Sequence, residues 1–320
     1  MAVKEFANVF SRYFVVGFYL PAFAGLVVLW QAITSDSLPP AVFRDASTGG
    51  KVLILGGLAL MLALLLSGLH YPIVRFLEGY PLRRWRDRFT VLGVLDKKMT
   101  GRWDREFERL SILRNGPHQS PERTNAAREL NVRFPAQAKH ILPTRLGNVI
   151  RAFETHPRKR YGFDGVSAWP RIELLLTDGE RADVAESKGD FAFFVNALVV
   201  TVTVALLLVI ERLWRIADAA DSIVALVVIC IVAGTGAIAS YFAAVGAAVR
   251  WGEPVRAAFD LHRFDLYARL GLKRPVTQAQ EMEVGRAMSR LFAFAEPAPN
   301  HLRAVDLPSK EGMTPDQKDR

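Results

Sequence analysis

The sequence contains a single cysteine, Cys230, which lies inside an apolar run. One cysteine excludes a disulfide within the chain, and we interpret Cys230 as a small apolar packing residue. Catalytic signatures are also lacking, because the chain has no HExxH, CxxC, GxSxG or Walker phosphate-binding motif. None of the six histidines stands at metal-ligand spacing from another ligand. We therefore predict no catalytic site, no metal and no cofactor.

Asp, Glu, Lys and Arg are missing from four long apolar stretches. These are residues 13–33, 52–71, 191–210 and 223–249, and crossing a bilayer takes roughly 20 apolar residues. Because backbone polar groups in hydrocarbon need internal partners, each stretch is predicted to be a transmembrane helix. The first is longer than a signal-peptide core and lacks a clear cleavage site, so we interpret it as a retained span. Without these side chains in the spans, coupled transport is disfavoured, whereas a passive pore is not.

The formal net charge is +9, and most of the excess lies in residues 75–190. Lys and Arg accumulate on the cytoplasmic side of membrane proteins, whereas the short segments 34–51 and 211–222 carry no positive excess. We therefore predict a multi-pass protein of the cell (inner) membrane with both termini in the cytoplasm. Its predicted partners include the lipid bilayer and anionic lipids at the inner face.

The predicted fold class is all-α, a four-transmembrane-helix protein with a mostly helical cytoplasmic domain between spans 2 and 3. The predicted parts are a transmembrane hairpin over 1–74, a cytoplasmic helical domain over 75–190, a second hairpin over 191–249, cytoplasmic helices over 250–293 and a disordered tail over 294–320.

Small residues form one face of the fourth span at three- and four-residue spacing. They are Gly236, Ser240, Ala243, Ala244 and Ala247. Small faces let helices approach closely in lipid. This face can pack against the other spans of the same chain, or against a second copy in a homo-oligomer that forms a pore.

Two polar or helix-breaking residues inside the spans also allow predictions. Pro21 is expected to kink the first span or to leave a carbonyl unpaired. Asn196, near one end of the third span, is expected to bond another helix rather than line a pore.

Helix starts are visible in the cytoplasmic segment. Ser120 before Pro121 is expected to begin one helix, and Thr144 can cap another. Glycines and Pro170 within RYGFDGVSAWPR, residues 160–171, predict a structured loop.

The part after the fourth span has signals of its own. Pro254 is expected to break the helix that leaves the membrane. Thr277 and Gln280 form a capping-box pair for a last helix over 278–293.

The stretch HILPTRLGNVIRAFETHPRKRYGFDGVSAWPRIELLL resembles a group of uncharacterised bacterial membrane proteins with an LPTRLGN helix start, then RYG, an aspartate and a WPR turn. The segment WGEPVRAAFDLHRFDLYARLGL after the fourth span is similar to the same group. The resemblance implies a four-span architecture and carries over no activity. Within the stretch, the candidate interaction loop for a cytoplasmic protein partner comprises Arg145, Asn148, Arg160, Tyr161, Asp164, Trp169 and Arg171.

Two basic clusters add candidate contacts. Arg83, Arg84, Arg86 and Arg88 follow the second span directly, so anionic lipid head groups are their expected partner and nucleic acid is not expected. The second cluster, HPRKR over 156–160, is compatible with a phosphate or an acidic protein.

We predict a membrane-anchored interaction or scaffold protein, since neither catalytic motifs nor charged residues in the spans are present. The alternative is a homo-oligomeric ion channel or pore, of which a stress- or phage-triggered membrane effector is a special form. An enzyme at the lipid interface is the least favoured class, because only Arg145, Arg160, Asp164 and Arg171 are available to it.

Overall fold

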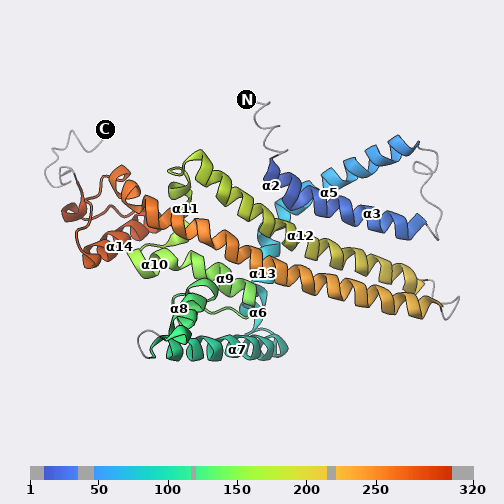
Figure 1. Ribbon diagram of the computed structural model, residues 1–320, viewed down its shortest axis with the longest axis horizontal. Coiled ribbons are helices and arrows are strands. Elements are labelled where there is room, and N and C mark those ends of the chain that lie inside the picture. Colours follow the sequence, from blue (N-terminus) through green and yellow to red (C-terminus); the bar gives the residue numbers. More distant parts are fainter. Residues whose placement is uncertain (1–10, 35–46, 117–119, 215–220, 305–320) are drawn as a thin grey trace. The chain divides into compact units, whose positions relative to one another are not determined.

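The computed structural model describes residues 11–34, 47–116, 120–214 and 221–304 of the protein (Figure 1). Across these ranges the chain is helical, and its β-type pairing is limited to an isolated bridge between Leu272 and Arg303. The all-α prediction is therefore confirmed. Four helical segments are long and apolar enough to cross a membrane, as predicted: Arg12–Ala32, Thr48–Leu77, Asp178–Leu213 and Ile223–Arg269.

The helices form two compact units. Unit 1 comprises Met1–Glu106, Leu142–Val149 and Ala182–Trp251. Unit 2 comprises Phe107–Ile141, Ile150–Arg181 and Gly252–Arg320.

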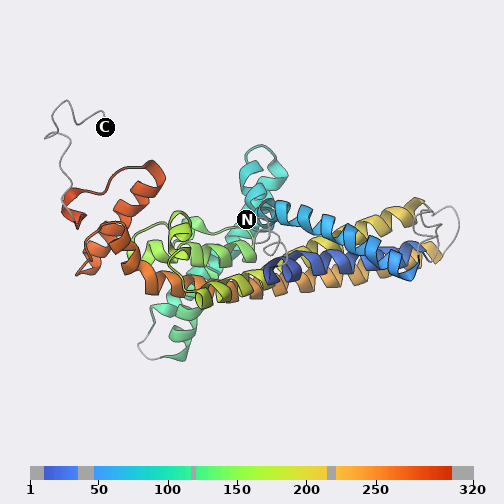
Figure 2. The same cartoon turned by 90° about the horizontal axis from the view of Figure 1, so that it is seen from above.

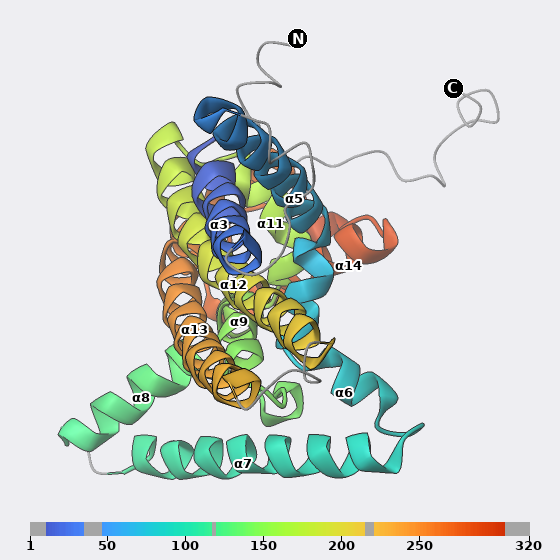
Figure 3. The ribbon, with the colours of Figure 1, turned by 90° about the vertical axis from the view of Figure 1, so that its right-hand side faces the viewer.

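Unit 1 is a bundle of apolar helices. Its first span is made of α2 (Arg12–Phe14), the π-helical turn η1 (Val15–Tyr19) and α3 (Leu20–Thr34), and its second is α5 (Thr48–Leu77). The other two spans belong to α12 (Asp178–Trp214) and α13 (Asp221–Arg269). Figure 2 shows α5 running along α3. In the end-on view of Figure 3, α3 lies between α5 and α12, and α13 lies beyond α12.

The interior of this bundle is apolar. Its buried cluster consists of Phe14, Phe18, Ala22, Ala63, Leu66, Ala192 and Val200. Burying side chains of this size contributes packing and transfer free energy together, and small residues among them let the helix backbones approach. Gly25 is one such small residue, since an added Cβ there would lie 2.1 Å from Val200 Cγ1.

Beside Pro21, where a kink or an unpaired carbonyl is predicted, the first span changes its helical repeat. The π-helical turn η1 ends two residues before the proline, and such turns accommodate a missing backbone bond within a helix. Asn196 is fully buried and donates from Nδ2 to the Gly17 carbonyl oxygen at 2.7 Å. Asn196 thus bonds another helix, as predicted.

The small-residue face of α13 is partly covered within the same chain. Ala244 and Ala247 are fully buried, whereas Gly236, Ser240 and Ala243 are half-buried. A Cβ added at Gly236 would lie 3.5 Å from Thr201 Cγ2 on α12. The end of the face near Ala247 therefore serves packing between helices of one chain.

Unit 1 also holds α6 (Tyr80–Trp85) and the first parts of α7 (Thr90–Arg114) and α9 (Arg145–Glu154). Thr144 caps α9 as predicted, since its hydroxyl accepts from Gly147 N at 3.0 Å. The Asn148 side chain bonds both the N–H and the carbonyl of Leu142, at 2.7 and 3.0 Å. A Cβ at Gly147 would lie 2.6 Å from the Glu78 carbonyl oxygen, so this glycine permits close backbone packing.

Unit 2 contains α8 (Pro121–Arg133), α10 (His156–Tyr161), α11 (Gly165–Glu173) and α14 (Gln278–Phe294), with short 3₁₀ turns at Ala138–His140 and Asn300–Leu302. Two predicted helix starts are confirmed. Ser120 caps α8, and Thr277 and Gln280 form the capping box of α14.

The loop predicted over 160–171 is wrong, because these residues belong mainly to α10 and α11. Gly162, at φ 83°, ends α10, and Asp164 Oδ2 accepts from Ser167 N at 3.0 Å to start α11. The glycines that indicated a loop are needed for a single turn between two short helices. Close packing is a second reason, since a Cβ at Gly162 would lie 2.5 Å from the Met282 carbonyl oxygen of α14.

The break predicted at Pro254 is also wrong, since α13 continues through it to Arg269. Proline removes one backbone bond, but Val255, Ala258 and Phe259 are buried on the following turns and hold the helix.

The prediction of a disordered tail is wrong for residues 294–304, which end α14 and then form a 3₁₀ turn bonded to the segment after α13. Leu302 is buried, Lys273 N donates to Leu302 O, and Ala304 N donates to Gly271 O, both at 2.8 Å. Residues 305–320 of the predicted tail lie outside the described residues.

Candidate functional site

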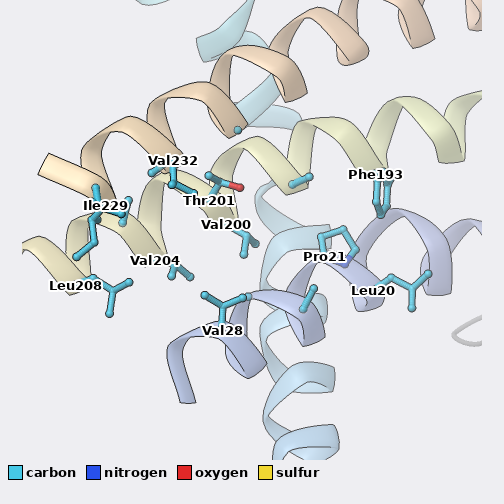
Figure 4. A pocket seen from close by; sticks show the side chains of 17 residues that line it. Leu20, Pro21, Val28, Phe193, Val200, Thr201, Val204, Leu208, Ile229 and Val232 are labelled. Carbon is cyan, nitrogen blue, oxygen red and sulfur yellow. The ribbon is translucent and has the colours of Figure 1, made fainter. Parts of the chain in front are cut away.

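An apolar groove of about 540 Å³ lies among α3, α12 and α13 in unit 1. Figure 4 shows Val28, Val200 and Val204 pointing into it, with Pro21 and Leu20 toward one end. Thr201 contributes the one hydroxyl group among the lining side chains, and none of them carries a charge. Such a surface suits an acyl chain or another apolar helix, and it offers ions a single polar side chain.

A second cleft, of about 580 Å³, combines arginines with aromatic rings where α5 is followed by α6. Arg75 donates to the Tyr71 hydroxyl at 3.1 Å, and its guanidinium lies 4.4 Å from the centre of the Tyr80 ring. Arg83, Arg84 and Trp85 complete the lining on the α6 side. Arginine beside Trp and Tyr is the composition expected at a membrane–water interface.

The four predicted lipid-contact arginines have different surroundings. Arg83 and Arg84 line this cleft. Arg86 instead forms salt bridges with Asp87 and Asp96, each at 3.5 Å. Arg88 is exposed and does not line the cleft. Two of the four are therefore brought together with Arg75, which the sequence prediction had not included.

The third candidate is a basic cleft of about 660 Å³ in unit 2, built from α8, α10 and the part of α13 that belongs to this unit. We call it the basic cleft. Its lining residues are Arg128, Asn131, Val132, His156, Lys159, Arg160, Glu253, Arg256, Ala257 and Asp260. Four of these side chains are cationic and two are anionic, and the volume lies within the range of small-ligand sites, roughly 300–1,000 Å³.

A hydrogen-bond network sets one wall of the basic cleft. Asp260 Oδ1 lies 2.8 Å from His156 Nε2 and accepts from the Tyr161 hydroxyl at 2.5 Å. Burial, together with the neighbouring Asp260 carboxylate, raises the pKa of Tyr161 to about 12. Tyr161 therefore stays protonated and acts as a donor, while the Arg263 guanidinium lies 4.6 Å from its ring centre.

Positive charge exceeds negative charge around the basic cleft. Buried Arg256 donates to Glu253 Oε1 at 2.9 Å, which pairs those two charges. Arg128 and Arg160 form neither a salt bridge nor a hydrogen bond with any residue in the described ranges. Burial and the like charges of Arg114 and Arg160 lower the pKa of Lys159. The site thus holds cations that the chain itself does not neutralise.

The seven residues of the predicted interaction loop divide between the two units, and most of them support local structure. Asn148 is buried against Leu142 as described above, and half-buried Arg145 begins α9. In unit 2, Asp164 caps α11 and Trp169 packs on Phe259 with ring centres 5.8 Å apart.

The remaining members also have distinct places. Arg171 donates to the Ser167 carbonyl at 2.9 Å, and its guanidinium lies 3.9 Å from the Phe292 ring centre. Arg160 lines the basic cleft, and Tyr161 donates to Asp260 at its wall.

Sequence reasoning missed Arg128, Arg256 and Asp260 as members of a site. Arg256 and Asp260 are four residues apart on one helix, a spacing that puts them on the same face. Their approach to His156 joins positions more than 100 residues apart. A single sequence holds no signal for that pairing.

No protein-family model matches this chain, and neither the curated proteins nor the solved structures contain a match to it. Among the described residues, no group of three or more His, Cys, Asp or Glu side chains could hold a metal ion. The four apolar helices and the all-α fold define the chain as a multi-pass helical membrane protein.

Proposed function

We propose that the protein is a membrane-anchored interaction or scaffold protein of the cell (inner) membrane. In this proposal both termini and the segment between the second and third spans are cytoplasmic, in agreement with the distribution of Lys and Arg. The four spans hold the chain in the bilayer, and unit 2 presents the basic cleft to a partner.

The observation that carries this proposal is the contrast between the spans and unit 2. The buried cluster of the bundle is made of apolar side chains, and the groove beside it is apolar as well. The cleft with unpaired cations, in contrast, is built from residues of unit 2 that lie outside the four apolar stretches. A recognition role is thus better supported than a conduction role.

Anionic lipid is the proposed partner of the arginine–aromatic cleft between α5 and α6. Arg84 is exposed there and forms no salt bridge within the described part of the chain. Arg75 is oriented by Tyr71 and Glu78, the latter at 3.2 Å. A lipid phosphate at this position would neutralise charge and anchor the end of the second span.

A homo-oligomeric channel or pore is the second candidate function, and a stress- or phage-triggered membrane effector is one form of it. It is favoured by the first half of the fourth span, where Val224, Ile231 and Val232 are each more than 60% exposed. A second copy packing on this surface would bury it and could enclose a pathway.

Ion flux through purified protein in liposomes separates the two functions. The variants are Gly236→Leu and Ser240→Leu, with Gly234→Leu as the matched control, because a Cβ at Gly234 meets nothing within 4 Å. The scaffold proposal predicts no flux at any voltage from protein that is helical and inserted. Flux that changes in Gly236→Leu but not in Gly234→Leu would overturn the proposal and assign the pore to the α12 side of α13. Flux sensitive to Gly234→Leu would overturn it in favour of a pore formed between copies.

A further inference from the structure

We infer that the basic cleft of unit 2 binds a small phosphate-bearing anion, through Arg128, Lys159 and Arg160 at its rim and Arg256 at its base. This inference rests on the proposed function, because it specifies the ligand class of the surface assigned there to recognition.

The first argument is the arrangement of cations. Lys159 and Arg160 are consecutive on α10, Arg128 comes from α8 and Arg256 from α13, so three helices contribute charge to one concavity. A phosphate group has several acceptor oxygens and is bound best by donors that converge from different directions. A solvated helix surface would instead spread its cations outward.

The second argument is that the cations are available. Arg128 and Arg160 form neither a salt bridge nor a hydrogen bond within the described chain, although the Asp260 carboxylate interacts electrostatically with Arg160. Lys159 donates to the side-chain amide oxygen Oδ1 of Asn131 at 3.3 Å. Bringing uncompensated like charges together costs free energy in the empty protein, and an anion that binds there recovers it. Burial is the main cause that lowers the pKa of Lys159, and the like charges of Arg114 and Arg160 lower it further.

The third argument concerns selectivity. Asp260 and Glu253 also line the cleft, and each already has partners: His156 and Tyr161 for Asp260, and Arg256 for Glu253. These carboxylates repel a ligand that is uniformly acidic over a long surface, whereas their remaining lone pairs can accept from hydroxyl groups. A compact phosphate ester with hydroxyls fits this mixed lining better than an acidic peptide does.

The test uses full-length protein in phosphatidylcholine nanodiscs, titrated with inorganic pyrophosphate by calorimetry. We expect binding in wild type and about tenfold or greater loss of affinity in Arg160→Gln and in Arg128→Gln, since a hydrogen bond to a charged group is lost in each. Arg158→Gln is the matched control, because Arg158 is on the same helix but faces Asp164 at 3.7 Å and does not line the cleft. Arg128, Arg158 and Arg160 are all exposed, so these variants are expected to fold.

A second arm identifies the source of the phosphate. In nanodiscs that also contain phosphatidic acid, pyrophosphate affinity falls if a lipid head group occupies the cleft, and it is unchanged if the ligand is free in solution. Both results support the inference and assign the source.

Three results would overturn it. These are no pyrophosphate binding by folded wild type, an equal loss in Arg158→Gln and Arg160→Gln, and binding of a polyglutamate peptide that outcompetes pyrophosphate. None of them depends on ion flux, so the inference and the proposed function can fail separately.

Discussion

The Asn196 side chain donates its amide hydrogen to the carbonyl oxygen of Gly17, at 2.7 Å, across two helices of the bundle. Gly17 stands four residues before Pro21, which has no N–H to complete the regular helical bond to that carbonyl. A side chain on α12 therefore replaces a backbone donor that the first span lacks. Water cannot satisfy the carbonyl in hydrocarbon, so this hydrogen bond fixes the axial register between α12 and the first span.

Asn196→Ala is expected to destabilise the bundle by about 1 kcal/mol, because it leaves the Gly17 carbonyl without that donor. In a Pro21→Ala background the restored N–H can bond the same carbonyl, so the cost of Asn196→Ala should be smaller there. Unfolding in sodium dodecyl sulfate, followed by circular dichroism, gives the four free energies of this cycle. Equal costs in both backgrounds would show that Asn196 does not compensate for Pro21.

Gly25→Ala is expected to destabilise unit 1 by about 1–3 kcal/mol, because the new Cβ would lie 2.1 Å from Val200 Cγ1. Gly57→Ala is the control, since a Cβ there meets nothing within 4 Å. Adding Val200→Ala to Gly25→Ala removes the obstructing methyl group and should recover part of the loss. The same detergent titration measures all variants, and a Gly57→Ala protein as unstable as Gly25→Ala would refute the packing explanation.

Gly285→Ala is expected to loosen α14 from the α10–α11 turn, because the added Cβ would approach the Tyr161 carbonyl oxygen to 2.0 Å and backbone cannot move aside. Gly179→Ala, near the start of α12, adds the same methyl group in open space and should be neutral or stabilising by up to about 1 kcal/mol. Hydrogen exchange reports the difference. Residues 278–294 should exchange faster in Gly285→Ala only, and equal protection in both variants would contradict the close contact.

The sequence predicted those features whose cause is local. Four uncharged stretches specify four membrane-length helices, and Ser120, Thr144 and Thr277 each supply a capping oxygen within their own turn. At Pro254 the local rule failed, because buried side chains on the next turns stabilise a helix that loses one backbone bond.

The parts of the candidate site that the sequence did not predict depend on contacts between residues far apart in the chain. The cluster HPRKR was recognisable as basic, but its meeting with Arg128 and Asp260 depends on how α8, α10 and α13 pack. Likewise, Gly162 resembled a loop residue, although its positive φ is needed for the single turn between α10 and α11, which packs against α14. Tertiary contacts of this kind leave no trace in the periodicity of one chain.

Lys159 provides a prediction for pH dependence. Its pKa is lowered in the folded chain from an ordinary value of 10.5, so the unfolded chain binds more protons between the two values. Stability contributed by this group should therefore rise as pH increases through that window. Thermal unfolding is measured for wild type and variants between neutral pH and pH 10.5. In Lys159→Gln the rise of stability with pH should be smaller than in wild type, and in Arg158→Gln it should be unchanged. A curve for Lys159→Gln parallel to wild type would contradict the lowered pKa.

The two backbone bonds that flank the Leu272–Arg303 bridge, from Lys273 N to Leu302 O and from Ala304 N to Gly271 O, have a consequence for cleavage of the chain. They join the residues before α14 to the residues after it. Both ends of the segment that contains α14 are therefore held next to the end of α13. Val276, 89% exposed just before α14, is an accessible position for a protease within that closed segment. A chain nicked there should stay assembled as two non-covalently associated fragments, and the cut should be visible only once a denaturant separates them.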